Sequence, residues 1–452
     1  MVESSESVGV IGAGLVGALV ALGLAKQGYS VTLYDLRSDP RTAKKTSLRS
    51  INLAVSERGI RALRYVDEEM AKRVLDGIIP MYGRMIHDLD GNQESQLYGL
   101  FGEAINSIDR KKLNQSLIEE IELFNSSAKS KIELIFEAKV TSVRVNGGVT
   151  IDYVHDGEPQ RDHKDFVVGA DGTYSVVRQS LQKLIRMNYS QEYIDMCYLE
   201  MYIPPGPNGS FRIDPNRLHI WPRKTFMLIA LANQDGSFTS TFFGPWELVE
   251  SLQQPKTIEF FFKKNFKDAI PLIGLDKIIE CFTTYPRGAL MQVNCSRYNF
   301  QDKCIIIGDA AHSMVPFYGQ GMNCGFEDVR ILLELLEKNG RDRQAAFDSY
   351  TETRAEDLKA ILKLALRNYH EMSSDVTSSL YLFRKKLDGV LGRLMPQHWI
   401  PLYTMVSFRS DISYSDAVRF SQKQQRILKW AEWGAVGSIL AGGALYLARR
   451  SK

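Results

Sequence analysis

The residues with the clearest chemical role near the N-terminus are three glycines and an aspartate. Gly12, Gly14 and Gly17 follow an apolar run and open a predicted helix over 15–26. In that setting the first glycine permits a tight turn, the second lets a pyrophosphate approach the backbone, and the third allows close helix–strand packing. Asp35, eighteen residues past Gly17, ends the next predicted strand and can accept from a ribose hydroxyl. The pattern predicts FAD or NAD rather than NADP, and the alternative for Asp35 is a capping carboxylate.

Two further glycine-rich turns follow later in the chain. Residues 165–178 read as a buried strand ending at Gly169, then Asp171 and a helix; the alternative is an ordinary β-turn with a surface arginine. Near 308 another strand ends beside Asp309, which can accept from a sugar-chain hydroxyl. A glycine-rich loop then opens a helix whose N–H groups can hold an electron-rich ring edge. His312 lies beside two alanines, which is more typical of a packed structural histidine than of an acid–base catalyst.

The elements that must position these turns can be read from the hydrophobic pattern. Strands predicted over 8–11 and 30–34 flank the first helix, as at the start of a doubly wound α/β domain. Between 218 and 243 apolar and polar residues alternate around a turn at Asp235 and Gly236, which predicts an antiparallel sheet. A buried strand returns at 304–308, followed by helix through about 368 and a mostly helical region broken by Pro396 and Pro401.

These elements predict an α/β fold with a discontinuous Rossmann-like FAD-binding domain interrupted by an antiparallel substrate domain. The predicted units are residues 1–184 (with a substrate-contacting segment at about 80–100), 185–290 for the sheet, 291–370 for the second part of the FAD-binding domain, 371–426 for a helical region and 427–452 for a membrane anchor.

The composition limits the possible partners. Of 452 residues, 24% are charged and 44% hydrophobic, which excludes a disordered or collagen-like chain. The net charge of +3 and the scattered basic residues argue against nucleic acid as a partner. Five cysteines without a CxxC spacing favour neither a disulfide framework nor a zinc site, so we expect no metal.

The two ends of the chain carry different expectations. Seven residues including Glu3 and Glu6 precede the first apolar run, so we expect no cleaved targeting segment. Residues 433–448 lack charges and precede Arg449 and Arg450, which predicts a short transmembrane tail anchor; a buried glycine-rich helix is the alternative. A short span suits a thin membrane such as the mitochondrial outer membrane, with the catalytic body in the cytosol.

The three motifs resemble those of a known family, the single-component class A flavin-dependent aromatic hydroxylases. They read GAGLVG at 12–17, GADGTYSVVR at 169–178 and GDAAHSMVPFYGQGMN at 308–323. Further segments resemble the fungal-like branch of that family that hydroxylates L-kynurenine: RSINLAVSERG at 49–59, RMIHD at 84–88, PFYGQGMNCGFED at 316–328 and IPLYTMVSFRSDISYS at 400–415. The resemblance covers nearly the whole chain.

The resemblance implies roles for particular residues. It places the substrate on Arg84, Tyr98, Asn368 and Tyr403, a donor set that suits a carboxylate. Without the resemblance these four would be an ordinary salt bridge and packing polar groups. The implied lid over the flavin is Pro316, Phe317, Tyr318 and Gln320, whose aromatic pair departs from some relatives. The implied FAD contacts are Gly12, Gly14, Val16, Gly17, Tyr34, Asp35, Leu36, Arg37, Ala54, Arg110, Asp171, Asp309, Met322 and Asn323.

The resemblance also implies a reaction. NADPH, bound transiently without a Rossmann unit of its own, would reduce FAD. O2 captured as a flavin hydroperoxide would then convert L-kynurenine to 3-hydroxykynurenine, in tryptophan degradation towards NAD biosynthesis. No catalytic side chain is expected because the flavin carries the chemistry. One alternative is another membrane-tethered enzyme of the family, such as a lipid epoxidase, with an apolar site lacking the fork of Arg84. The other is a flavin-less binding protein, against which the intact motifs argue.

Overall fold

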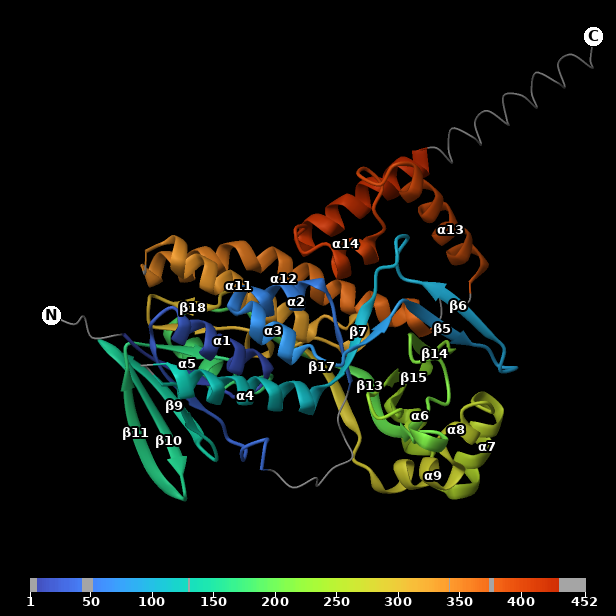
Figure 1. Cartoon of the computed structure of the whole chain (residues 1–452), viewed down its shortest axis with the longest axis horizontal. Helices are drawn as coiled ribbons and strands as arrows, with labels where there is room; N and C mark the ends of the chain where they lie inside the picture. The colour runs from blue at the N-terminus through green and yellow to red at the C-terminus, as the bar shows by residue number, and fades with distance from the viewer. Residues whose placement is uncertain (1–5, 43–51, 129–130, 341, 374–377, 431–452) are drawn as a thin grey trace, which may run out of the picture.

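The computed structural model describes residues 6–42, 52–128, 131–340, 342–373 and 378–430. In Figure 1 helices α13 (Ser379–Leu394) and α14 (Leu402–Phe408) lie together at one end of the molecule. The three-stranded sheet of β9 (Lys139–Asn146), β10 (Gly148–His155) and β11 (Glu158–Lys164) projects at the other end.

The first layer is a six-stranded sheet in the order β18-β19-β12-β1-β2-β8. Its central strands β1 (Ser7–Ile11), β2 (Ser30–Tyr34) and β12 (Phe166–Gly169) are parallel and buried almost throughout, as expected for a sheet covered on both faces. The other strands are β8 (Glu133–Ile135), β18 (Asn299–Phe300) and β19 (Cys304–Ile306). Because β19 pairs with β12 across more than a hundred residues of chain, the sheet is discontinuous in sequence.

Helices cover this sheet. The first, α1 (Leu15–Lys26), has the predicted bounds and packs against α4 (Arg110–Ser127) and α11 (Gly321–Lys338). The remaining helices of this part are α2 (Glu57–Val66), α3 (Glu68–Val74), α5 (Val176–Leu184), α10 (Asp309–His312), the 3-10 turn η2 (Pro316–Tyr318) and the long α12 (Arg343–Ser373). A small sheet of β3 (Asn52–Val55), β7 (Ile105–Asp109) and β4 (Ile79–Met81) joins them.

The second layer is a seven-stranded sheet in the order β17-β13-β16-β15-β14-β5-β6. Its strands are β13 (Tyr189–Ile203), β14 (Arg217–Arg223), β15 (Phe226–Ala232), β16 (Phe238–Gly244), β17 (Gly288–Cys295), and, from far earlier in the chain, β5 (Gly83–His87) and β6 (Gln93–Leu97). The predicted hairpin at Asp235 and Gly236 is confirmed as the β15–β16 turn, and β5 joins β14 in parallel.

A separate apolar core lies on one face of this sheet. It contains Phe242, Phe262, Phe266 and Phe282, and helices α6 (Trp246–Ser251), α7 (Pro255–Asn265), α8 (Ile270–Ile273) and α9 (Leu275–Thr284) contribute to it. The sheet therefore has its own core, while its β5–β6 edge faces the C-terminal helices. The domain boundaries given by the sequence stay predictions.

The predicted fold class needs one correction, which concerns its C-terminal transmembrane helix. No helix within the described ranges is long and apolar enough to cross a membrane. The stretch leading into the predicted span, 414–430, is helical but exposes Lys429 and Trp430 on its surface. Residues 431–452 lie outside the described residues. The fold that the structure supports is a mixed α/β fold with a helical C-terminal region.

A buried cluster of charges joins α11 to its neighbours. One oxygen of Asp328 accepts from Arg354 Nε at 3.0 Å and Nη2 at 2.8 Å, and the other accepts from the Gly308 N–H at 3.0 Å and contacts His312. Burial opposes ionisation of Asp328, but the charges of His312 and Arg354 outweigh it and lower its pKa to about 2. Next to it, Glu327 accepts from Arg354 at 2.9 Å and Arg58 at 2.7 Å.

We therefore expect Asp328→Asn to destabilise the protein strongly. The substitution leaves the buried Arg354 guanidinium without part of its counter-charge, and breaking such a pair costs about 3–5 kcal/mol. Urea denaturation measures the loss. Asp416→Asn, which breaks an exposed pair with Arg419, is the matched control and should cost less than about 1 kcal/mol.

The same carboxylate predicts a pH dependence. Because its folded pKa lies below the unfolded value, Asp328 contributes stability that is complete above about pH 4 and is lost as the pH falls towards 2. The parent should therefore lose more stability than Asp328→Asn between pH 4 and 2. Parallel losses in the two proteins would contradict this assignment.

Candidate active site

In the first glycine-rich turn, one glycine has room for a Cβ atom and the other two do not. A Cβ at Gly12, which has φ +99°, would lie 2.5 Å from the Ala170 carbonyl oxygen, and a Cβ at Gly17 would lie 1.7 Å from that of Gly12. At Gly14 the nearest atom, Arg37 Nη2, is 4.0 Å away. Helix α1 starts directly after Gly14 with no side-chain cap, so its first N–H groups are suited to a phosphate. The turn fits the pyrophosphate of a dinucleotide.

At the end of β2 and just after it, some side chains contact this turn and others lie on the surface. The buried carboxylate of Asp35 accepts from Ala13 N–H at 2.7 Å and from the Arg37 N–H at 2.8 Å and Nε at 3.0 Å. Leu36 and Arg37 are exposed. Tyr34 reaches the turn only with its carbonyl, which accepts from Gly12 N–H at 2.7 Å, while its hydroxyl points away to Asp162. A bound ribose would therefore meet Asp35 together with Arg37.

The second and third motifs interlock beside this turn. Asp171 accepts from Ser175 Oγ at 2.5 Å and from Val176 N–H at 2.7 Å, so its carboxylate caps α5. Arg178, buried rather than on the surface, donates to the Ala310 carbonyl at 2.7 Å and ties this helix to α10. Asp309 begins α10 after Gly308. A Cβ at that glycine would lie 3.2 Å from Val16, which places Val16 against the third motif.

Residues predicted at the flavin ring meet where α11 begins. Asn323 is fully buried and donates to the carbonyls of Ala54 at 2.8 Å and Gly319 at 2.7 Å, while its oxygen accepts from Ser56 N–H at 2.8 Å. Gln320 accepts from the Tyr414 hydroxyl at 3.0 Å. Helix α11 has no side-chain cap, so the backbone around Met322 presents its N–H groups at this point. Arg110 is exposed at the start of α4, one turn before Asn114, whose amide nitrogen donates to the Ala13 carbonyl at 3.0 Å.

Three of the four predicted substrate residues lie together. Arg84 is buried on β5, and its guanidinium carbon lies 5.7 Å from the ring centroid of Tyr98 and 5.4 Å from that of Tyr403. These two rings stack with centroids 4.9 Å apart, and the Tyr318 ring of the lid stacks on Tyr403 at 5.6 Å. Burial raises the pKa of both tyrosines, which keeps the hydroxyls protonated. The Arg84 Nη1 donates to Glu371 at 2.8 Å.

The fourth residue, Asn368, binds the lid. Its amide nitrogen donates to the Phe317 carbonyl at 2.6 Å, and its buried oxygen has no hydrogen-bond partner within the described part of the chain. Phe317 packs against Tyr369 and Phe243, with centroids 4.7 and 5.2 Å away. An unsatisfied buried acceptor costs about 1–3 kcal/mol, so a ligand N–H is the natural partner of this oxygen.

Sequence reasoning missed Glu371 as the partner of Arg84. The available signal was its place three residues after Asn368; the helix, predicted to end at about 368, continues to Ser373, so both side chains share a face of α12. It could not show that β5, 287 residues earlier, packs against that face.

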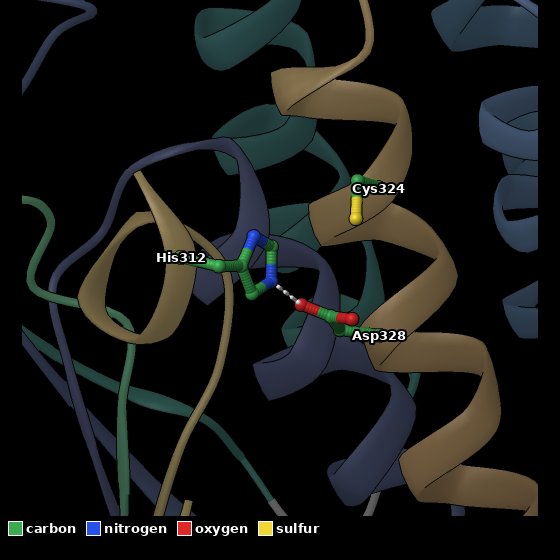
Figure 2. Close-up of side chains that lie close together, drawn as sticks. All are labelled: His312, Cys324 and Asp328. Atoms are coloured by element: carbon green, nitrogen blue, oxygen red, sulfur yellow. Dashed lines mark hydrogen bonds and ion pairs between the residues drawn. The ribbon is translucent and has the colours of Figure 1, made fainter. Parts of the chain in front are cut away.

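A group of metal-ligand types also lies beneath the third motif. Figure 2 shows the His312 ring directed at Asp328, with Cys324 one turn earlier on the same helix. Arg354 donates to Cys324 Sγ at 3.3 Å as well as to Asp328. A guanidinium at this point repels a metal cation, so the group forms part of the buried charge cluster and His312 has a structural role.

The glycine geometry predicts that two alanine substitutions act differently. Gly17→Ala places a methyl group inside contact distance of the Gly12 carbonyl, so it should destabilise the FAD-free protein by about 2 kcal/mol or more. Gly14→Ala meets no atom closer than 4.0 Å, so the FAD-free protein should keep its stability while FAD binding weakens at least about tenfold. Flavin fluorescence titration and thermal melting separate the two effects. Tight FAD binding by Gly14→Ala would contradict the placement of the pyrophosphate.

Comparison with known proteins supports this geometry. The family model described as an FAD binding domain matches residues 5–365. Among solved structures, 2-methyl-3-hydroxypyridine-5-carboxylic acid oxygenase aligns with a TM-score of 0.66 at 17% identity, covering 84% of this chain and 95% of that chain. The structure of P. aeruginosa PqsL in complex with 2-aminobenzoylacetate aligns with a TM-score of 0.64 at 19% identity, covering 82% and 97%. At these identities the likeness shows the fold alone.

Sequence relatives are far more similar. Kynurenine 3-monooxygenase of Candida albicans is 53% identical, covering 98% of this chain and 97% of the relative. The proteins of the same name from Saccharomyces cerevisiae and Anopheles gambiae are 53% and 42% identical, each over 97% of this chain and over 97% and 89% of the relative. The resemblance to class A flavin-dependent hydroxylases is confirmed, and the chain belongs to the kynurenine 3-monooxygenase family.

Proposed function

We propose that this chain uses FAD, NADPH and O2 to hydroxylate L-kynurenine to 3-hydroxykynurenine. The observation that carries the proposal is the buried guanidinium of Arg84 beside the stacked rings of Tyr98 and Tyr403. The full-length similarity to relatives named kynurenine 3-monooxygenase supports it. FAD, when bound, supplies the redox chemistry and the activation of oxygen, with NADPH as the reductant.

The polar end of the substrate is recognised by charge. L-kynurenine carries a carboxylate, and a guanidinium held on a strand presents parallel N–H donors to such a group. The protonated hydroxyls of Tyr98 and Tyr403 add donors beside it. Arg84 also pairs with Glu371, which balances part of the charge of the guanidinium.

The aromatic end of the substrate is oriented by the lid and α12. The free oxygen of Asn368 accepts an N–H of the substrate, while its nitrogen holds the lid through Phe317. The lid turn packs Phe317 and Tyr318 against aromatic neighbours, which excludes water from the reacting ring. No side chain is assigned as an acid or base. This chain positions the ring and keeps the site dry.

The cellular location is a separate proposal. We propose the mitochondrial outer membrane, with the catalytic body facing the cytosol, as the resemblance implies. Fractionation of cells expressing the full chain, followed by protease treatment of intact mitochondria, tests it. Recovery of the chain away from mitochondria, or its protection from protease, would contradict the proposal.

We expect Arg84→Ala to weaken kynurenine binding without loss of FAD. A charge-assisted pair contributes about 3 kcal/mol at a buried site, so the KM for kynurenine should rise at least about 100-fold. Arg84→Lys should fall between parent and alanine because lysine keeps the charge but not the fork. The exposed Arg161→Ala is the matched control and should leave KM unchanged. Loss of bound flavin in Arg84→Ala would contradict the assignment of Arg84 to the substrate.

A further inference from the structure

Helix α13 packs closely on the strand edge that carries the substrate site. Two of its glycines face Leu100 just after β6: Cβ atoms at Gly389 and Gly392 would lie 3.6 and 2.8 Å from that leucine. The indole N–H of Trp399 donates to Asp388 at 3.0 Å and holds the end of the helix. This packing fixes which residues of α13 approach the sheet.

Lys385 of α13 approaches this edge of the sheet. Its ammonium group lies 3.4 Å from the side-chain oxygen of Gln96, a buried residue of β6. Gln96 stands directly opposite Arg84 in the β5–β6 ladder, and directly opposed side chains lie on the same face of a sheet. Lys385 therefore approaches the face of the sheet from which Arg84 binds Glu371.

The charges around Lys385 come from four elements. Arg84 on β5 repels it, while Glu371 on α12 and Glu94 on β6 attract it. On its own helix, Arg384 pairs with Asp388 at 3.3 Å and Lys386 is exposed. Burial, followed by the charge of Arg84, lowers the pKa of Lys385 to about 8. Part of the Lys385 population is therefore neutral in weakly alkaline solution.

We propose that Lys385 is a second cationic binding residue for the substrate carboxylate and that it takes up a proton from solvent when this carboxylate binds. The inference rests on the proposed function and adds a residue that the family motifs did not supply. The proton moves from buffer to Lys385 Nζ, and no other bond is made or broken.

The physical reason is charge balance in a buried site. Arg84 already faces one carboxylate, that of Glu371, and an entering substrate brings a second. A new negative charge near a lysine favours its charged form, so binding and protonation support each other. Two cations at one end of the site also orient the amino acid, because its own ammonium group is repelled from them.

Isothermal titration calorimetry of the FAD-loaded protein with L-kynurenine tests the proposal. At pH 8, in buffers of different ionisation enthalpy, the slope of the binding enthalpy should report uptake of up to about half a proton by the parent, beyond any contribution from the substrate. At pH 6.5 this contribution should disappear, because Lys385 is already charged. Above pH 8 the affinity of the parent should fall.

Three variants separate Lys385 from its surroundings. Lys385→Met should lose the proton uptake and bind kynurenine about tenfold more weakly at pH 7. Lys385→Arg should keep the affinity without the uptake, because its charge is permanent. Lys386→Met, at the exposed neighbour, should match the parent.

The outcomes distinguish this inference from the proposed function. Equal affinity and equal proton uptake in Lys385→Met and the parent, with FAD content unchanged, would overturn the role of Lys385. Absence of any kynurenine binding to the FAD-loaded parent would instead overturn the proposed function. If Lys385→Met alone fails to fold, Lys385→Arg provides the test. Proton uptake by the arginine variant would then contradict the proposal.

Discussion

The ion pair between Asp328 and Arg354 joins the turn that carries Asp309 to helix α12. Both side chains are buried, and the same carboxylate binds Gly308 just before α10 and His312 at the end of α10. A buried charge is tolerated only where it is paired and fully hydrogen-bonded, so the cluster forms in a defined arrangement of α10, α11 and α12. The Asp328–Arg354 ion pair therefore fixes the position of the turn that carries Asp309, although neither side chain is assigned to a ligand.

Helix α12 connects this charge cluster to the predicted substrate residues. From Arg354 to Asn368 the helix rises about 21 Å, at about 1.5 Å per residue. Asn368 binds the lid, and Glu371 binds Arg84 on the other sheet. Between them the Tyr369 hydroxyl donates to the Thr225 carbonyl at 2.7 Å in the β14–β15 turn. One rigid element thus meets the buried charge cluster, the lid and the sheet that holds the substrate. This explains how a site built from two layers can keep a single shape.

Local patterns in the sequence predicted what is decided locally. The strand-turn-helix around Gly12 and the alternating strands around Gly236 depend on neighbours in the chain, and they formed as predicted. The capping role of Asp171, the partner of Arg84 and the approach of Lys385 to Gln96 depend on packing that spacing does not encode. The membrane-spanning part of the predicted fold class is not supported, because no helix within the described ranges is long and apolar enough to cross a membrane.

The most direct test of the account is NADPH oxidation by the full-length, FAD-loaded protein with and without L-kynurenine, with 3-hydroxykynurenine measured in parallel. We expect kynurenine to stimulate NADPH oxidation strongly and the hydroxylated product to form in step with it. A protein that binds flavin but whose NADPH oxidation is unchanged by kynurenine would still be consistent with the fold and the FAD site. It would contradict the assignment of Arg84, Tyr98, Asn368 and Tyr403 to this substrate.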